Sequence, residues 1–265
     1  MKTSRTKLAP ATRRLVTEVY GRLDYGALGP VYCYEGGDEF WRAKRGLCNR
    51  LGSRVAVRLR QKLGRGGRSL YVGAGVAELP ALIMEMVELG RTVEPYNLRR
   101  AEVAALNRAC HSIPLTFHAA DAAGAKGRFD HLWMASVLND PERFPHVSPL
   151  SYGRGNPLTL DPLKFDTERR IVRALVARCT GKLARPGLVT TTTEEVIWIA
   201  EWCHRHRVPY RVGKRYYPTA LVGDPICFIQ IGKNYQQAAE KVSVLTHPTP
   251  VRQDAPFTKH RSRIA

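Results

Sequence analysis

Apolar residues recur along the chain with two different periods. Between residues 41 and 63 an apolar residue returns at every fourth position, at Leu47, Leu51, Val55, Leu59 and Leu63. This spacing is typical of one side of an α-helix. After Gly64 to Gly67, short β-branched runs alternate with helix-like segments. The alternation predicts strands at 68–72, 91–95, 114–119 and 129–135, and helices over about 77–89 and 98–110.

The second half of the chain continues this alternation and then departs from it. A helix is expected over about 167–184 with Asp166 as its N-cap, followed by the strand "GLVTTTT" and a helix that Thr193 can cap. Two strand-like runs, "VPYRVGKRYYP" and "PICFIQIG", then follow with no helical segment between them. Such a pair is antiparallel or joined by a long loop, because a parallel crossover needs about a dozen residues. The whole pattern predicts a mainly parallel α/β sheet covered on both faces.

The turn at Gly73-Ala74-Gly75 follows the first of these strands directly. Glycine lets the backbone turn tightly and approach a ligand, and the next helix offers free N–H groups. The same motif also occurs as plain punctuation between a strand and a helix. A dinucleotide fingerprint would have its third glycine at position 78, where this chain has Glu78.

Two acidic residues are predicted at the carboxyl ends of the following strands. An acid at Glu94 can accept both hydroxyls of a ribose. Asp121, in "FHAADAAG", can accept from an adenine amino group. Either acid alone is equally well read as an ordinary loop carboxylate, whereas the two together favour a nucleotide site.

These motifs together resemble the class I S-adenosylmethionine-dependent methyltransferases over about residues 66–232. The resemblance rests on "LYVGAG", "RTVEPYN", "AADAAG" and "FDHLWMASVLND", and on a final antiparallel pair that looks like the family's seventh strand beside its sixth. It implies a three-layer Rossmann-like sandwich with a mainly parallel seven-stranded sheet and a C-terminal antiparallel strand. It also implies an enzyme that uses S-adenosylmethionine as its cofactor.

The resemblance also implies roles for individual residues. Gly73, Ala74 and Gly75 would border the methionine part of the cofactor; Glu94 and Pro95 the ribose; Asp121 and Ala122 the adenine; Ala135 and Ser136 would lie beneath the sulfonium. Two positions depart from the family pattern, namely Tyr71 where an acid is usual and Ala77 where a third glycine is usual. Glu78 can replace the missing partner of the methionine ammonium.

The methyl acceptor is less clearly indicated than the cofactor. The long Pro- and Gly-rich stretch at 140–165 is typical of a functional loop or lid. Within it Asp140, His146 and Tyr152 are candidate catalytic groups. Four aromatic residues of the N-terminal region can wall a flat substrate or simply pack over the sheet: Tyr25, Tyr32, Tyr34 and Trp41. Positioning and desolvation can drive methyl transfer, so an obligatory base is not required.

The formal net charge is +19, and much of it is N-terminal. Residues 40–77 contain ten Lys or Arg and no Asp or Glu. Arg50, Arg54, Arg58 and Lys62 repeat beside the apolar stripe, as a phosphate-binding surface or as a solvated helix face. A small-molecule acceptor is favoured over RNA or DNA. A nicotinamide-dependent oxidoreductase and a non-catalytic nucleotide-binding protein remain as alternatives.

The sequence therefore predicts three regions: a basic helical cap or substrate region at 1–65, a methyltransferase domain at 66–232 with an insertion at 140–165, and a basic tail at 233–265. Six cysteines without a C-x-x-C pair indicate neither a zinc site nor a disulfide framework. No apolar run reaches the ~20 residues of a membrane span. We expect a cytoplasmic protein without a metal or a membrane partner, and the sequence leaves its oligomeric state open.

Overall fold

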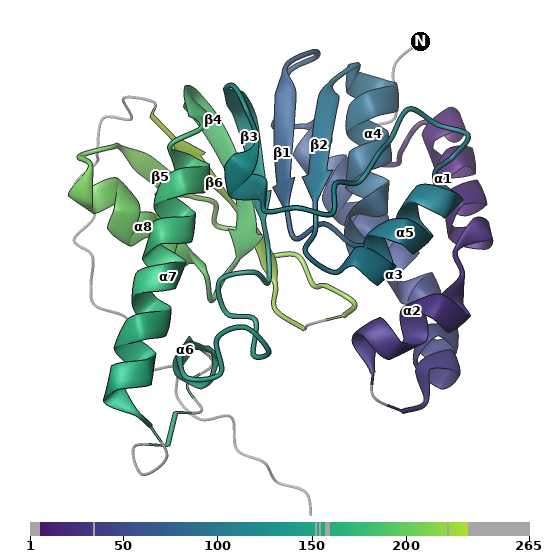
Figure 1. Cartoon of the computed structure of the whole chain (residues 1–265). Coiled ribbons are helices and arrows are strands. Elements are labelled where there is room, and N and C mark those ends of the chain that lie inside the picture. Colours follow the sequence, from purple (N-terminus) through teal and green to yellow (C-terminus); the bar gives the residue numbers. More distant parts are fainter. Residues whose placement is uncertain are drawn as a thin grey trace, which may run out of the picture. The chain divides into compact units, whose positions relative to one another are not determined.

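The computed structural model describes residues 6–33, 35–151, 153, 155–156, 160–221 and 223–232. Tyr34, Tyr152 and the predicted basic tail at 233–265 lie outside these residues. Helices and strands alternate through most of the described chain (Figure 1). The helices are α1 Pro10–Arg22, α2 Tyr25–Tyr32, α3 Gly37–Arg60, α4 Leu79–Leu89, α5 Arg100–Ala109, α6 Val147–Ser151, α7 Pro162–Thr180 and α8 Val196–Arg205. The strands are β1 Arg68–Val72, β2 Thr92–Tyr96, β3 Phe129–Met134, β4 Leu183–Thr192, β5 Tyr210–Val212 and β6 Ile226–Ile231.

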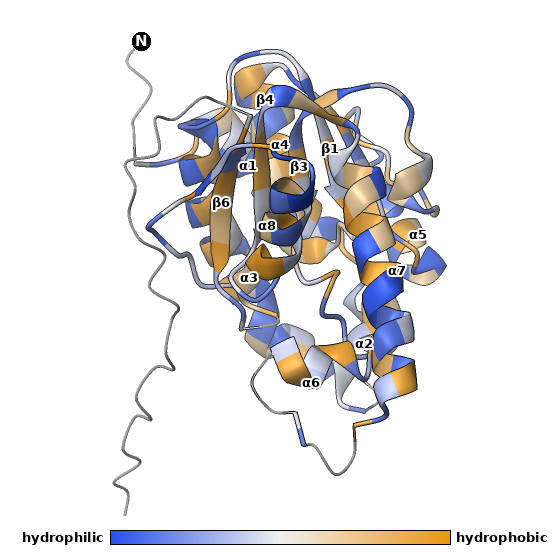
Figure 2. Cartoon of the chain, turned by 90° about the vertical axis from the view of Figure 1, so that its left-hand side faces the viewer, coloured by the Kyte–Doolittle hydropathy of each residue, from blue (hydrophilic) through white to orange (hydrophobic). Residues whose placement is uncertain are grey.

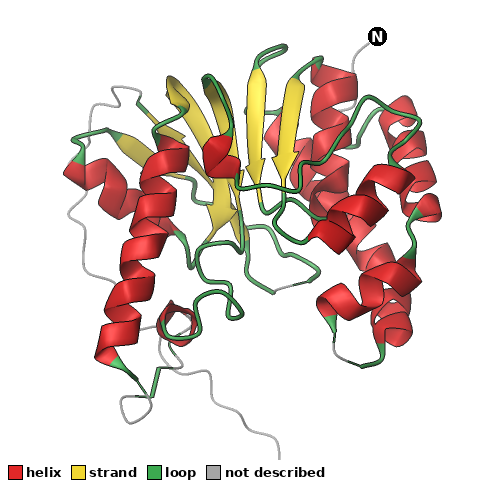
Figure 3. Ribbon diagram, in the orientation of Figure 1, coloured by secondary structure: helices red, strands yellow, loops and turns green. Residues whose placement is uncertain are grey.

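The described strands form one sheet in the order β2-β1-β3-β4-β6-β5 (Figure 3). β1 pairs in parallel with β2 and β3, and β3 pairs in parallel with β4. β6 lies between β4 and β5 and is antiparallel to both. The last strand is therefore inserted between its two predecessors, which is the arrangement expected for the final antiparallel pair. The fold is a Rossmann-like α/β sandwich with a mainly parallel sheet.

Helices cover both faces of the sheet. Buried residues of α1, α3, α4 and α5 pack with Tyr71, Trp133 and Phe228 on one face, whereas buried residues of α6, α7 and α8 pack with Leu70, Leu132 and Ile229 on the other. Successive strand residues point to opposite faces, so each strand supplies both layers. Figure 2 shows the consequence, because β6 is hydrophobic along its length whereas α7 carries both hydrophobic and hydrophilic turns.

The predicted strand at 114–119 is wrong, and the sheet of the described residues has six strands rather than seven. Only His118 pairs there, through a parallel bridge to Tyr96. The backbone of Phe117 is bonded by a side chain instead: its N–H donates to Asn107 Oδ1 over 2.7 Å, and its carbonyl accepts from Asn107 Nδ2 over 3.0 Å. The side-chain amide of Asn107 in α5 thus makes the backbone hydrogen bonds that a neighbouring strand would otherwise make.

Two predicted helix caps are also wrong. α7 begins at Pro162, and Asp161 accepts hydrogen bonds from Leu163 N and Lys164 N, so Asp166 lies inside the helix. Proline is favoured in the first helical turn, because its missing N–H has no partner to lose there. α8 begins at Val196 with Glu195 at the N-cap position, so Thr193 does not cap it.

The predicted division at residue 65 stays a prediction. α1, α2 and α3 precede β1, and they pack against α4 and α5 of the sheet layer. At the point of closest approach Gly52 of α3 has no room for a side chain, because a Cβ there would lie 2.9 Å from Ala77 O and from Pro80 Cγ. This contact sets α3 directly over the start of α4.

Candidate functional site

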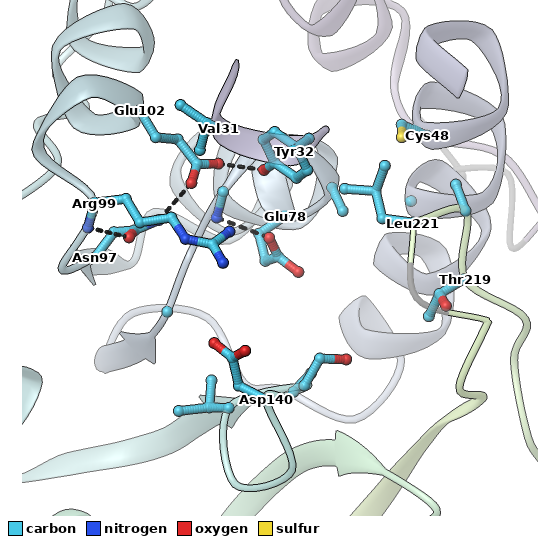
Figure 4. A pocket seen from close by; sticks show the side chains of 18 of the residues that line it. Val31, Tyr32, Cys48, Glu78, Asn97, Arg99, Glu102, Asp140, Thr219 and Leu221 are labelled. Atoms are coloured by element: carbon cyan, nitrogen blue, oxygen red, sulfur yellow. Dashed lines mark hydrogen bonds between the residues drawn. The ribbon is translucent and has the colours of Figure 1, made fainter. Parts of the chain in front are cut away.

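A cavity of about 480 Å³ opens at the carboxyl edge of the sheet. Its wall is built from the glycine turn after β1, the residues after β2, the loop after β3, one side of α3 and the segment 218–221 (Figure 4). Ligand pockets of proteins range from about 300 to 1,000 Å³ and occur at this edge in open α/β sheets. Of the residues predicted from sequence, the cavity brings together Gly73, Gly75, Ala135, Ser136 and Asp140.

The glycine turn approaches the cavity because its residues have no side chains to intervene. Gly73 has a φ of +70°, and a Cβ there would lie 2.7 Å from a methyl group of Val137. Ala74 is buried, donates its N–H to Tyr96 O over 3.0 Å, and does not line the cavity. Gly75 N donates to Glu78 Oε2 over 2.8 Å. The Glu78 carboxylate therefore accepts the hydrogen bond of the backbone N–H that begins the following helical turn.

Two carboxylates stand beside this turn. Glu78 and Glu102 both line the cavity, and Figure 4 shows them on the same side of it as Tyr32. Glu102 accepts from the Tyr32 hydroxyl and, over 3.0 Å, from Asn97 Nδ2. Burial raises the pKa of Glu78 to about 7, and burial likewise raises the pKa of Glu102. An acidic pair of this kind, with Glu102 buried and Glu78 partly buried, favours a ligand that carries positive charge.

Glu94 does not lie where the sequence placed it. It precedes the end of β2 by two residues, pairs with Arg68, and does not line the cavity. The sheet register explains the difference, since Val72 pairs with Tyr96 and the residue beside Gly73 is therefore Asn97. Asn97 lines the cavity and donates to Ala74 O over 2.8 Å. The residue that follows β2 beside the glycine turn is therefore an amide, and its position depends on the strand register.

The other predicted cofactor residues on this side lie outside the cavity. Pro95 is buried inside β2, and Ala122 is buried in the one-turn helix that follows Asp121. Asp121 accepts from Ala123 N over 2.9 Å and lies 3.5 Å from Arg178. Leu98, by contrast, lines the cavity and is 54% exposed although it is a large apolar residue.

The loop after β3 is held by one fully buried carboxylate. Ser136 lines the cavity with a φ of 58°, a conformation that costs free energy for a residue other than glycine. Glu195 accepts hydrogen bonds from Ser136 N at 3.0 Å and from Val137 N and Leu138 N at 2.6 Å. Burial raises the pKa of Glu195, and these hydrogen bonds oppose the rise. The sequence reasoning did not identify this residue, because it meets the loop only in the folded chain.

The three candidate catalytic residues have separate places. Asp140 lines the cavity opposite Glu78 and Glu102 (Figure 4). His146 instead lines a second, shallower hollow with Lys164 and Glu168. Tyr152 lies outside the described residues. Only Asp140 is thus brought to the glycine turn by the described part of the chain.

The part of the cavity lined by α3 and by the segment before β6 is mainly apolar. Leu51 and Val55 of α3 face Leu221 of the segment before β6, and Cys48 lies beside them. Burial raises the pKa of the Cys48 thiol to about 12, so it is neutral and unreactive at neutral pH. Of the predicted aromatic wall, Tyr32 lines the cavity, whereas Trp41 is buried in the core. One end of the cavity therefore holds the two carboxylates together with Arg99, whose charge acts on Glu102, and the other end is suited to a flat or apolar group.

Within the described ranges, no helix combines the length and apolarity needed to cross a bilayer. The described residues also include no group of three or more His, Cys, Asp or Glu side chains placed to hold a metal ion.

Comparison with known proteins finds likeness only at the level of three-dimensional structure. No protein-family model matches the sequence, and no curated protein matches it. Among solved structures, magnesium protoporphyrin IX methyltransferase from Synechocystis PCC 6803 with bound SAM aligns with a TM-score of 0.49 and 13% identity, over 85% of this chain and 99% of that one. Two further alignments are weaker. The precorrin-6y C5,15-methyltransferase of Geobacter metallireducens has a TM-score of 0.44 and 10% identity over 68% of this chain and 89% of that one. The M. jannaschii tRNA m1G37 methyltransferase has a TM-score of 0.42 and 10% identity over 69% of this chain and 50% of that one. The strand order and strand directions define the fold independently of these alignments.

Proposed function

We propose that the chain is an S-adenosylmethionine-dependent methyltransferase. The observation that carries the proposal is the convergence of the glycine turn, the end of β2 and the loop after β3 on one cavity at the carboxyl edge of the sheet. In an open α/β sheet this crevice is the ligand site. The inserted antiparallel β6 supports a methyltransferase in particular, since it agrees with the resemblance seen in the sequence.

The charge of the cavity suits this cofactor. S-adenosylmethionine carries two positive groups, a sulfonium and an ammonium. Glu78 and Glu102 lie beside Gly75, where the methionine part would lie, so they can stabilise both groups. Binding of a cation lowers the pKa of a nearby carboxyl, which would shift Glu78 toward its ionised form.

The nucleoside part of the cofactor has a place in the same cavity. Asn97 at the end of β2 can hydrogen-bond a ribose hydroxyl, although an amide is a weaker acceptor than the carboxylate expected there. Leu98 and Val137 then flank the position for the adenine, and stacking of the base would cover the exposed Leu98 side chain. Ala135 and Ser136 would lie beneath the sulfonium, as predicted from sequence.

The reaction follows from this placement. A lone pair of the acceptor attacks the methyl carbon in line with the S–C bond, which breaks and leaves its electron pair on sulfur as the thioether S-adenosylhomocysteine. The apolar end of the cavity between Leu51 and Leu221 would hold the group that receives the methyl. Asp140 lines the same cavity and can orient the acceptor or take its proton. That group belongs either to a free small molecule, which the sequence favours, or to a larger molecule that can reach the cavity.

Calorimetric titration with S-adenosylmethionine, S-adenosylhomocysteine and NAD⁺ tests the proposal. We expect the first two to bind with micromolar affinity and NAD⁺ not to bind. Glu102→Gln removes one cavity charge and should weaken S-adenosylmethionine binding about tenfold, because a desolvated ion pair contributes at least about 1.4 kcal/mol. Glu94→Gln is the matched control, since Glu94 lies outside the cavity, and it should leave the affinity unchanged. Failure of both adenosyl ligands to bind the folded protein would reject the proposed function.

A further inference from the structure

Two segments far apart in the sequence are basic and contain no acidic residue. The first is 40–77, with ten Lys or Arg. The second is 202–223, which contains Arg205, Arg207, Arg211, Lys214 and Arg215 and neither Asp nor Glu. Ion pairs of these segments are made with acids outside them, as in Arg60–Glu88, Arg68–Glu94 and Arg205–Glu201. The two segments form one basic surface only if the fold brings them together.

The fold places the end of α3 beside the final strands. The Lys62 ammonium lies over the ring of Phe228 in β6, 5.2 Å from its centroid. Burial and the nearby Arg211 guanidinium lower the pKa of Lys62, so positive charges of the two segments lie close to each other. Such a gathering of like charge costs free energy unless an anion occupies it.

The same two segments also form the apolar end of the cavity. Leu51 and Val55 of α3 line it from one side, and residues 218–221 line it from the other. The row Arg50, Arg54, Arg58 and Lys62 runs along α3 next to this lining, because positions that differ by three or four residues are neighbours on a helix. Arg50, Arg54 and Lys62 are exposed. On the facing segment Lys214 and Arg215 are exposed, only three to four residues before Pro218.

An exposed aromatic ring lies among these basic residues. Tyr216 is 57% exposed and directly follows Lys214 and Arg215. An aromatic face beside cations is the combination on which single-stranded nucleic acids stack and pair their phosphates. A small anion would use the charges but would gain nothing from the ring.

From this arrangement we infer that the surface binds a nucleic-acid strand and directs one of its bases to the cavity. The basic surface consists of Arg50, Arg54, Arg58, Lys62, Arg211, Lys214, Arg215 and Tyr216. Binding of the strand needs only this surface, whereas methylation of the base rests on the proposed function. The acceptor is then a nucleobase, whose planar ring suits the apolar end of the cavity. A single strand is required, because a base inside a duplex cannot reach a recessed site without leaving its stack.

Fluorescence anisotropy of the whole chain with labelled oligonucleotides tests the inference. The probes are mixed-sequence single strands of RNA and of DNA, each about 20 nucleotides long, and a duplex of the same length. The surface variant is Arg54→Ala/Lys62→Ala/Lys214→Ala. The control variant Arg14→Ala/Lys164→Ala/Arg170→Ala removes the same charge from exposed positions on α1 and α7. Thermal melts of both variants confirm that they are folded.

We expect wild type to bind a single strand more tightly than the duplex, with affinity falling steeply as salt rises. Each phosphate contact contributes about 0.7 to the slope of log K against log salt for a single strand, so the surface variant should lose about 2 from that slope and at least about tenfold in affinity. The control variant should retain wild-type binding. The RNA and DNA probes distinguish the two kinds of strand.

Equal loss in both triple variants, or no binding of any strand at low salt, would overturn the inference and leave a solvated basic face. Tighter binding to vesicles containing anionic phospholipid than to either strand would overturn it in favour of a membrane surface. The two proposals fail separately. Loss of S-adenosylmethionine binding in calorimetry rejects the methyltransferase without affecting the anisotropy result. Loss of strand binding with the cofactor still bound rejects only the nucleic-acid acceptor.

Discussion

Replacing Glu78 by glutamine is expected to stabilise the protein at alkaline pH. The Glu78 side chain is enclosed by the cavity wall, and burial raises its pKa from 4.5 to about 7. A glutamine oxygen can still accept the hydrogen bond that Gly75 N donates over 2.8 Å. The substitution therefore removes the charge and keeps the local hydrogen bond.

The size of the effect follows from the pKa. A tenfold change in an equilibrium corresponds to about 1.4 kcal/mol, so ionising Glu78 at a pH above 7 costs the folded state about 3 kcal/mol. Because the pKa of Glu78 is raised in the folded state, the stability that the neutral carboxyl provides is fully present below pH 4.5. This stability is lost as pH rises through about 7. At pH 8 Glu78→Gln should therefore raise the free energy of unfolding by about 3 kcal/mol, and at pH 4.5 by almost nothing.

Urea denaturation of both proteins between pH 4.5 and 8.5 measures this difference. Other titrating groups contribute equally to both proteins, so the difference isolates Glu78. Glu18→Gln is the control, because Glu18 is a surface residue that pairs with Arg14 on the same helix. If a cation binds here, Glu78→Gln should also weaken S-adenosylmethionine binding, since stability gained at a functional site is commonly lost as activity. If the difference in the free energy of unfolding stays the same from pH 4.5 to 8.5, ionisation of Glu78 does not destabilise the folded protein.

Three further substitutions test the packing that supports the site. Arg91→Leu should cost about 3 to 5 kcal/mol in urea denaturation, because it leaves the Glu85 carboxylate buried without its arginine partner; a loss below about 1 kcal/mol would contradict this. Glu195→Gln should cost about 2 kcal/mol and weaken S-adenosylmethionine binding, because an amide nitrogen cannot accept the loop's hydrogen bonds; unchanged affinity would show that the loop does not shape the site. Gly52→Ala should cost about 1 to 3 kcal/mol in thermal melts through overpacking of α3 on α4. Gly46→Ala in the same helix meets no atom within 4 Å and should not destabilise.

Most of the fold can be predicted from sequence because its signals are local. A strand buried on both faces is apolar along its length, and the helix between two such strands carries its own period, so β1, β3 and β6 are found within a residue or two. The failure at 114–119 has a non-local cause, since the Asn107 side chain supplies the hydrogen bonds that a strand would have made. The start of α7 was predictable, because Asp161 followed by Pro162 is a cap signal that Asp166 lacks.

The candidate site was less predictable because it depends on register and on distant contacts. Gly73 and Gly75 are recognisable from the turn itself. The residue beside them after β2 is set by strand pairing: Asn97 lines the cavity, whereas Glu94, three positions earlier, does not. Tyr32 and Glu102 are 70 positions apart and meet only after α2 packs on α5.

A crystal structure of the protein with S-adenosylhomocysteine tests the central claim most directly. We expect electron density for the ligand in the cavity, with its amino group beside Glu78 and Glu102, its ribose at Asn97 and its base between Leu98 and Val137. Density at another place, or an empty cavity at saturating ligand, would contradict the claim that this cavity holds the methyl donor.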